Sequence, residues 1–179
     1  MLISLIVPCY NEEEAMPLFY KEASRVAAEM KASHGAEFEF IFVDDGSRDG
    51  TLRVARELHA QDPRVRYVSF SRNFGKEAGI YAGLQAAKGD YVATMDADLQ
   101  DPPALLPQML DTLLTGEYDC AASRAGVLPL PSHPASRARR PSPAPAETSA
   151  ASAGAPSHRQ SLGCSPLTRS RRAVFIWQV

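Results

Sequence analysis

Cysteine is scarce in this sequence, and its few copies do not form a covalent or metal-bound framework. The 179 residues contain three cysteines, Cys9, Cys120 and Cys164, which are widely spaced and form no CxxC pair. An odd number of isolated cysteines, with no secretory signal ahead of them, argues against a disulfide scaffold and against a structural zinc site. We therefore expect a protein of a reducing compartment, the cytoplasm.

Long hydrophobic runs are absent as well. The opening segment MLISLIVP is apolar, but it stops at Pro8 and no basic residues precede it, so it predicts a strand and not a leader peptide. No run approaches the roughly 18 to 20 apolar residues that a membrane-spanning helix needs. We expect no transmembrane segment in this chain.

The last third of the chain contains no lysine and almost no acidic residues. Residues 125–179 hold seven Arg and one acid, Glu147, whereas residues 1–124 hold 12 basic and 20 acidic residues, so the net charge of −2 divides into +6 and −8. The tail also contains eight Pro and nine Ser, without helical or strand periodicity. Such a segment buries too little apolar surface to offset an ordering cost of roughly 1 to 2 kcal/mol per residue. We expect residues 125–179 to be disordered, including the apolar residues 173–179.

The first two thirds of the chain alternate between short apolar runs and longer amphipathic segments. Each run is followed by a loop and a candidate helix, and nearly continuous apolar strands are typical of a parallel sheet covered by helices on both faces. The sequence therefore predicts an α/β fold with a mainly parallel sheet. The candidate strands are Ile3–Val7, Phe38–Val43, Val65–Phe70 and Tyr91–Met95, with a last short one at Tyr118–Ala122.

Two of the amphipathic segments carry specific expectations. The segment after the first run has apolar residues at spacings of three and four, which predicts a helix with acids in its first turn. In the segment after the third run, three alanines form a narrow face suited to close packing on a sheet. These positions are Met16, Phe19, Ala23, Val26 and Met30 in the first segment, and Ala78, Ala82 and Ala86 in the second.

Acidic residues follow three of the candidate strands: Glu12–Glu14, Asp44–Asp45 and Asp96–Asp98. Because the carboxyl ends of parallel strands lie at one edge of a sheet, these acids gather where α/β proteins bind ligands. A carboxylate cluster repels itself unless protons or cations compensate it. Hard oxygen ligands suit Mg2+ or Mn2+, so the cluster predicts a divalent cation site.

Each of these motifs also has a purely structural explanation. The acids before Pro102 could stabilise a helix N-terminus through the helix dipole. Asp45 could close a turn, and Asp49 with Thr51 could cap the helix that follows. Asn11 and Glu12 could cap the first helix, and Tyr10 could pack or stack on a base. Arg72 and Lys76 flank Gly75 in a loop that suits phosphate, although isolated surface charges are the usual case.

The four segments VPCYNEEE, VDDGSRDGT, SRNFGKEAGIYAGL and DADLQDPP occur in this order, and independent caps have no reason to recur so. Together they resemble the family 2 inverting glycosyltransferases, in particular the polyprenyl-phosphate sugar transferases such as dolichyl-phosphate mannose synthase and the bacterial undecaprenyl-phosphate glucosyltransferases. The resemblance covers residues 1 to about 124. It implies a GT-A fold, which is Rossmann-like, with residues 1–124 as its nucleotide-sugar-binding half.

The resemblance also implies roles for individual residues. Asp96 and Asp98 match the catalytic acids of a DxD signature, and the metal ligands would be Asp98 and Gln100. The positions that match the nucleotide-sugar contacts are Pro8, Tyr10, Glu12, Val43, Asp45, Lys76, Asp96, Ala97 and Arg124. In the family reaction a polyprenyl phosphate oxygen attacks the anomeric carbon while Mg2+ or Mn2+ stabilises the departing nucleoside diphosphate, and the single displacement inverts the anomeric centre.

The same resemblance sets the expected partners. The donor would be a UDP- or GDP-linked sugar, and the acceptor in full-length relatives a polyprenyl phosphate at the inner face of the membrane. We expect no nucleic-acid partner. Which sugar and base are used is not set by any motif in the sequence.

The chain departs from the family pattern after Arg124, where its composition changes abruptly. Translation of a GC-rich gene in a wrong frame would produce such a segment, so we expect a frameshift near Ala125 and a truncated domain with little or no transferase activity. The alternative is a genuine basic tail whose arginines, such as Arg137, Arg139 and Arg140, bind anionic membrane.

Two other classes of protein remain open from the sequence. A nucleotidyltransferase or sugar-phosphate enzyme would share the sheet and the metal-binding acids, but neither GxxxxGK nor GxGxxG occurs. A non-catalytic nucleotide-binding or interaction domain, built like a receiver domain, would need a lysine at the end of a later strand. Metal-dependent preference for a nucleotide sugar would separate the transferase from both.

Overall fold

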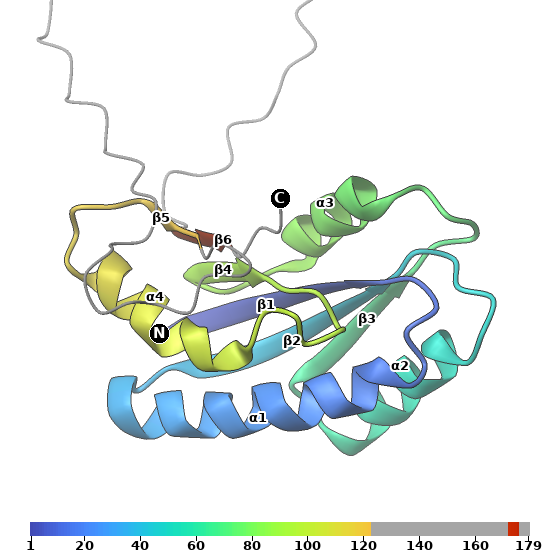
Figure 1. Cartoon of the computed structure of the whole chain (residues 1–179), viewed down its shortest axis with the longest axis horizontal. Coiled ribbons are helices and arrows are strands. Elements are labelled where there is room, and N and C mark those ends of the chain that lie inside the picture. Colours follow the sequence, from blue (N-terminus) through green and yellow to red (C-terminus); the bar gives the residue numbers. More distant parts are fainter. Residues whose placement is uncertain (123–171, 176–179) are drawn as a thin grey trace, which may run out of the picture.

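A computed structural model describes residues 1–122 and the backbone of residues 172–175. Its centre is one six-stranded sheet in the order β3-β2-β1-β4-β6-β5, and every neighbouring pair is parallel (Figure 1). The predicted parallel α/β fold is therefore confirmed. The strands are β1 (Leu2–Cys9), β2 (Glu37–Asp44), β3 (Val65–Ser69), β4 (Tyr91–Thr94), β5 (Cys120–Ala121) and β6 (Arg172–Phe175).

Helices cover both faces of the sheet. Figure 1 shows α1, α2 and α4 along one face and α3 on the other. The helices are α1 (Ala15–His34), α2 (Thr51–Gln61), α3 (Lys76–Ala86) and α4 (Leu106–Leu114), with the 3-10 turn η1 (Pro103–Leu105) before α4. No helix in residues 1–122 is long and apolar enough to span a membrane.

Burial explains the nearly continuous apolar strands. Six successive residues of β2, Phe38–Val43, are buried, and so are the five residues Ile3–Val7 of β1. Side chains that point to opposite faces are both buried because α1, α2 and α4 cover one face and α3 the other. The larger core cluster includes Phe19, Phe40 and Leu110, and the smaller one lies against α3.

The helix α1 buries the predicted stripe but begins later than its acids suggest. Met16, Phe19, Ala23, Val26 and Met30 are all buried. The helix starts at Ala15 and has no acid in its first turn, so Glu12–Glu14 belong to the preceding loop. The expected acidic first turn is therefore wrong, because the amides of these residues bond to the neighbouring loop, as described below.

The helix α3 packs closely on the sheet through glycines and not through the three alanines we expected. Gly79 and Gly83 are its buried residues. A methyl group added at Gly83 would lie 2.3 Å from Cγ2 of Ile6 on β1, and one at Gly79 would lie 3.4 Å from Cβ of Pro8. Since Ala78, Ala82 and Ala86 are only half-buried, it is the missing side chains that allow the close approach.

The strand β6 differs from the expectation for the tail. Arg172–Phe175 lie between β4 and β5 and pair with both, with Tyr91 opposite Arg172 and Thr94 opposite Phe175. These four residues are therefore ordered, and the expected disorder is wrong for them. The remainder of the expected tail, including Arg137, Arg139 and Arg140, lies outside the described residues.

Candidate functional site

The sheet order creates a crevice at the carboxyl ends of β1 and β4. From β1 the chain moves to β2 and β3 on one side and then returns to β4 on the other, so the loops after β1 and β4 diverge from adjacent strands. Ligands of open α/β sheets bind at such a switch point. The loop after β1 carries Tyr10–Glu14, and the loop after β4 carries Asp96–Asp101.

Four acids face one another across this crevice. Burial raises the pKa of Glu12, and the negative charges of Asp98 and Asp96 raise it further. Burial likewise raises the pKa of Asp101, followed by the charges of Asp96 and Asp98, while Lys76 acts in the opposite direction. Because the charges of Asp96 and Asp98 disfavour the charged forms of Glu12 and Asp101, the crevice is a region of negative potential that favours a bound cation.

Lys76, at the start of α3, supplies a positive charge at this crevice. Its Nζ donates to Oδ2 of Asp96 at 2.7 Å. Within residues 1–122 it is the single cation that forms an ion pair with any of the four acids. The pair links the loop after β3 to the loop after β4, and about half of the lysine side chain remains exposed.

The two expected metal ligands, Asp98 and Gln100, lie two positions apart in the loop after β4. Oδ1 of Asp98 accepts the amide of Gln100 at 3.1 Å, and Leu99 between them has a φ of 60°. In residues 1–122 no three His, Cys, Asp or Glu side chains converge into a complete metal site. Mg2+ commonly takes one or two protein carboxylates and completes its octahedron with waters and substrate phosphates, so this hard-oxygen set suits a cation that arrives with a phosphorylated ligand.

Asp45 holds the loop that follows β3. Its Oδ1 and Oδ2 accept the amides of Phe74 and Gly75 at 2.7 and 2.9 Å, and the residue is 4% exposed. The neighbouring Gly46 has a φ of 69°, and a methyl group there would lie 2.3 Å from the carbonyl carbon of Arg72. Asp45 thus sets the position of the loop that carries Lys76.

Asp44 acts within its own strand end. Its Oδ1 accepts the amide of Ser47 at 3.0 Å, and its Oδ2 accepts the hydroxyl of Ser69 at 2.9 Å. These bonds tie the end of β2 to the end of β3. Both members of the predicted Asp44–Asp45 pair therefore make structural bonds at the site.

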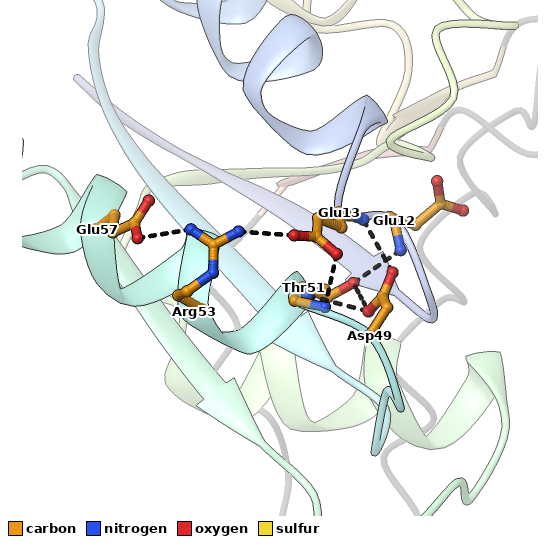
Figure 2. Close-up of polar contacts among 7 residues, drawn as sticks. Glu12, Glu13, Asp49, Thr51, Arg53 and Glu57 are labelled. Carbon is orange, nitrogen blue, oxygen red and sulfur yellow. Dashed lines mark hydrogen bonds and ion pairs between the residues drawn. The ribbon is translucent and has the colours of Figure 1, made fainter.

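The loops after β1 and β2 hold each other's backbone amides just before the starts of α1 and α2 (Figure 2). Oγ1 of Thr51 accepts the amide of Glu12 at 2.8 Å, and Oδ2 of Asp49 accepts the amide of Glu13 at 3.2 Å. In return, Oε2 of Glu13 accepts the amide of Gly50 at 2.8 Å, at the start of α2. Asp49 also accepts the amide of Thr51 at 3.0 Å within its own loop, although the N-cap position of α2 is Gly50, so the expected side-chain cap is not formed.

An open hollow of about 450 Å3 lies beside this junction. It is lined by Asn11, Glu12, Glu13, Glu14, Ala15 and Asp49. The volume lies within the range of small-molecule sites. Its acidic lining suits a ligand that brings its own cation.

Four more predicted site residues lie at or beside the crevice. Tyr10 is 42% exposed and available for a ligand, and Pro8 is half-buried at the end of β1. Val43 and Ala97 are buried in the two core clusters, so their side chains pack in the core beneath the site and are not exposed to a ligand. Arg124 lies outside the described residues.

The structure also shows contacts near the site that the motifs did not predict. Glu13 and Arg53 join the junction between the two loops, where Arg53 donates to Oε1 of Glu13 at 2.6 Å. The guanidinium of Arg72 lies over the exposed ring of Phe74, 4.7 Å from its centroid. No spacing in the sequence signals the first contact, because Glu13 and Arg53 are 40 positions apart and meet only through the sheet.

Several curated proteins similar to this chain are named as bactoprenol or undecaprenyl-phosphate sugar transferases. The chain is 43% identical over 125 residues to the "Prophage bactoprenol glucosyl transferase homolog" of Escherichia coli, covering 70% of this chain and 40% of that protein. It is 36% identical over 122 residues to the "Undecaprenyl-phosphate 4-deoxy-4-formamido-L-arabinose transferase" of Pseudomonas fluorescens, covering 68% and 34%. The chain thus spans about 40% or less of the length of these relatives.

A solved structure shares the fold. The mannosyltransferase of Pyrobaculum calidifontis, determined with GDP-Man and Mn2+, superposes with a TM-score of 0.56 at 22% identity over 68% of this chain and 35% of that one. This likeness confirms the expected GT-A type of α/β fold. The model of the family described as "Glycosyl transferase family 2" matches residues 4–163. Its motifs, its fold and this match agree, and the chain belongs to glycosyl transferase family 2.

Proposed function

We propose that this chain forms the donor-binding part of an enzyme that transfers a sugar from a nucleotide sugar to a polyprenyl phosphate in cell-envelope glycan synthesis. The named activities of the relatives support the acceptor class, since bactoprenol and undecaprenyl phosphate are both polyprenyl carriers. As the chain spans about 40% of the first of these relatives, the complete reaction is part of the proposal. The donor would carry UDP or GDP.

The observation that carries the proposal is the set of opposed acids at the switch point. A nucleotide sugar brings a diphosphate, and a diphosphate binds a carboxylate-lined crevice only through a cation. Asp98 and Gln100 would hold Mg2+ or Mn2+ together with donor phosphate oxygens, and the metal would neutralise charge on the leaving diphosphate.

The other residues have roles that follow from their positions. Lys76 carries a positive charge next to Asp96 and is placed to meet a donor phosphate when the cation occupies the acids. The exposed ring of Tyr10 can stack on the base, and Glu12 can accept a hydrogen bond from a donor hydroxyl. Arg124 would engage the donor phosphates.

The acceptor requires little proton transfer. A polyprenyl phosphate is already ionised at neutral pH, so its oxygen can attack the anomeric carbon without a strong general base. One displacement at that carbon inverts its configuration. We place this step at the cytoplasmic face of the membrane, where an anionic lipid carrier and a water-soluble donor meet.

Calorimetric titration of the purified chain with UDP and GDP, with and without Mn2+, tests the proposal. We expect metal-dependent binding of one nucleotide, and Asp98→Ala should weaken it at least about tenfold, as losses of metal-site residues commonly do. Asp111→Ala is the matched control, because Asp111 is an exposed acid on α4 that contacts His34 at the far end of α1.

The control variant should bind like the wild type. Wild-type protein that binds neither nucleotide, or binds equally well without metal, would contradict the proposed donor site. A turnover assay with polyprenyl phosphate then separates sugar transfer from the alternative, donor binding in a non-catalytic domain.

A further inference from the structure

Several contacts between the loops after β1 and β2 form a connected set, which we call the loop lock: Glu12, Glu13, Asp49, Gly50, Thr51 and Arg53 (Figure 2). Asn11 adds two more contacts between the same loops, since its amide donates to Oγ of Ser47 at 3.0 Å and its Oδ1 accepts the amide of Arg48 at 2.9 Å. In most helices the residues that cap an N-terminus come from the same loop. Here each loop supplies acceptors for the amides of the other. The two loops therefore cannot move independently without leaving backbone amides unpaired.

Glu13 is the centre of the lock. One of its oxygens accepts the amide of Gly50 and the other pairs with Arg53 at 2.6 Å, while its own amide is held by Asp49. A methyl group at Gly50 would lie 2.2 Å from Oε1 of Glu13. The carboxylate thus rests directly on the backbone at the start of α2, in space that only glycine leaves open.

The lock determines where the preceding residue points. The amide of Glu12 is fixed by Thr51, and its carboxylate accepts no hydrogen bond from any residue in the described part of the chain. Burial raises the pKa of that carboxylate, and the nearby charges of Asp98, Asp96 and Asp49 raise it further. A flexible loop would turn Glu12 away from these acids into solvent, since like charges repel, so its position depends on the bonds that hold its backbone.

We propose that Glu13 is a positioning residue of the donor site, which acts through the loop lock to hold Glu12 opposite Asp96 and Asp98. The inference rests on the proposed donor function. Glu13 itself contacts no reacting group. It prepares the crevice for a cation and a nucleotide diphosphate before either binds, which lowers the ordering cost of binding.

The test uses the full chain and three variants. Glu13→Ala removes both acceptor oxygens, and Glu13→Gln keeps one amide oxygen for Gly50. The control is Glu57→Ala, because Glu57 pairs with Arg53 from its other side at 2.7 Å and touches neither loop. The measurements are the Kd for UDP and GDP with Mn2+, and hydrogen exchange at the amides of Glu12, Glu13 and Gly50.

Glu13→Ala should raise the Kd about tenfold and speed exchange at those three amides, whereas Glu13→Gln should recover most of the affinity. Glu57→Ala should change neither quantity. Equal Kd values for wild type and Glu13→Ala, or equal losses in Glu13→Ala and Glu57→Ala, would overturn the inference.

The two proposals can fail separately. If the wild type binds neither nucleotide, the proposed donor function is wrong. Hydrogen exchange alone then tests whether Glu13 holds the two loops together. Faster exchange confined to the three amides in Glu13→Ala supports positioning by Glu13, and unchanged exchange overturns it.

Discussion

Glu39 is a carboxylate inside the sheet, away from the crevice, and its contacts show how single residues hold this fold together. Its Oε1 accepts the hydroxyl of Ser4 at 2.5 Å and the amide of Lys88 at 2.6 Å, and its Oε2 accepts from Arg66 at 3.2 Å. The residue is 7% exposed. Removing a nearly buried acceptor leaves its donors without partners, which costs more than the bonds themselves contribute.

Glu39→Ala should lower the free energy of unfolding by about 2 kcal/mol, because it leaves the hydroxyl of Ser4 and the amide of Lys88 without their acceptor. Urea denaturation measures the change. The control is Glu37→Ala, at the exposed start of the same strand, where the lost contact is a surface pair with Lys31 and no measurable change is expected. Similar values for both variants would show that the Glu39 network contributes little.

The same network makes the stability of the protein depend on pH. Burial raises the pKa of Glu39, but hydrogen bonds from Ser4, the amide of Lys88 and Arg66 outweigh it, so the pKa lies below its ordinary value of 4.5. A lowered folded-state pKa stabilises the protein above the unfolded-state value and loses that stabilisation as the pH falls through the folded-state value. Stability measured below pH 4.5 should therefore fall more steeply in the wild type than in Glu39→Ala.

At the scale of elements, the residues by which α3 packs on the sheet could not be predicted from sequence spacing. It is weakly amphipathic, and the alanine stripe that we expected to face the sheet is only half-buried. Gly79 and Gly83 let the helix axis approach β1, and an approach this close leaves no room for a methyl group at Gly83. Packing density therefore overrides the helix propensity that alanine would bring.

Gly83→Ala should destabilise the protein by about 2 kcal/mol, within the usual cost of overpacking a core. The methyl group meets Cγ2 of Ile6, and the gain in helix propensity of up to about 1 kcal/mol is too small to compensate. Thermal unfolding measures the change. In an Ile6→Ala background the same substitution should cost less, and equal costs in both backgrounds would exclude the clash as the cause.

At the scale of the whole molecule, the sheet joins segments that are far apart in the chain. β5 ends at Ala121 and β6 begins at Arg172, yet β6 lies between β4 and β5 and provides the pairing that connects them. The sheet beyond β4 therefore depends on a strand from the segment that composition marks as unstructured.

A chain that ends at Ser170 should unfold at a temperature several degrees lower than the full chain, because β4 loses its neighbour and β5 its only partner among the described strands. Hydrogen exchange at the amides of Val92 and Thr94 should be faster. A chain that ends at Phe175 is the control and should match the full protein. Equal melting and exchange in all three chains would contradict a role for β6.

Predictions from sequence succeeded where the signal is local. The five strands were located to within about two residues at each end, because a buried strand must be apolar along its whole length and its neighbours must turn. The stripe of α1 was correct because a helix at a sheet repeats its buried positions every three to four residues. The start of α1 was placed too early, since the acids that suggested it bond instead to another loop.

The sequence by itself determined the α/β class, the family and the group of acids at the carboxyl edge, because alternation and short motifs are properties of neighbouring residues. Only the tertiary structure decided that Asp45 holds the Phe74 loop, that Glu13 accepts the amide of Gly50, that Lys76 pairs with Asp96 and that β6 enters the sheet. Each of these contacts joins residues at least 20 positions apart in the chain. Such pairs meet only when the strand order is set, and the strand order follows from burying both faces of one sheet.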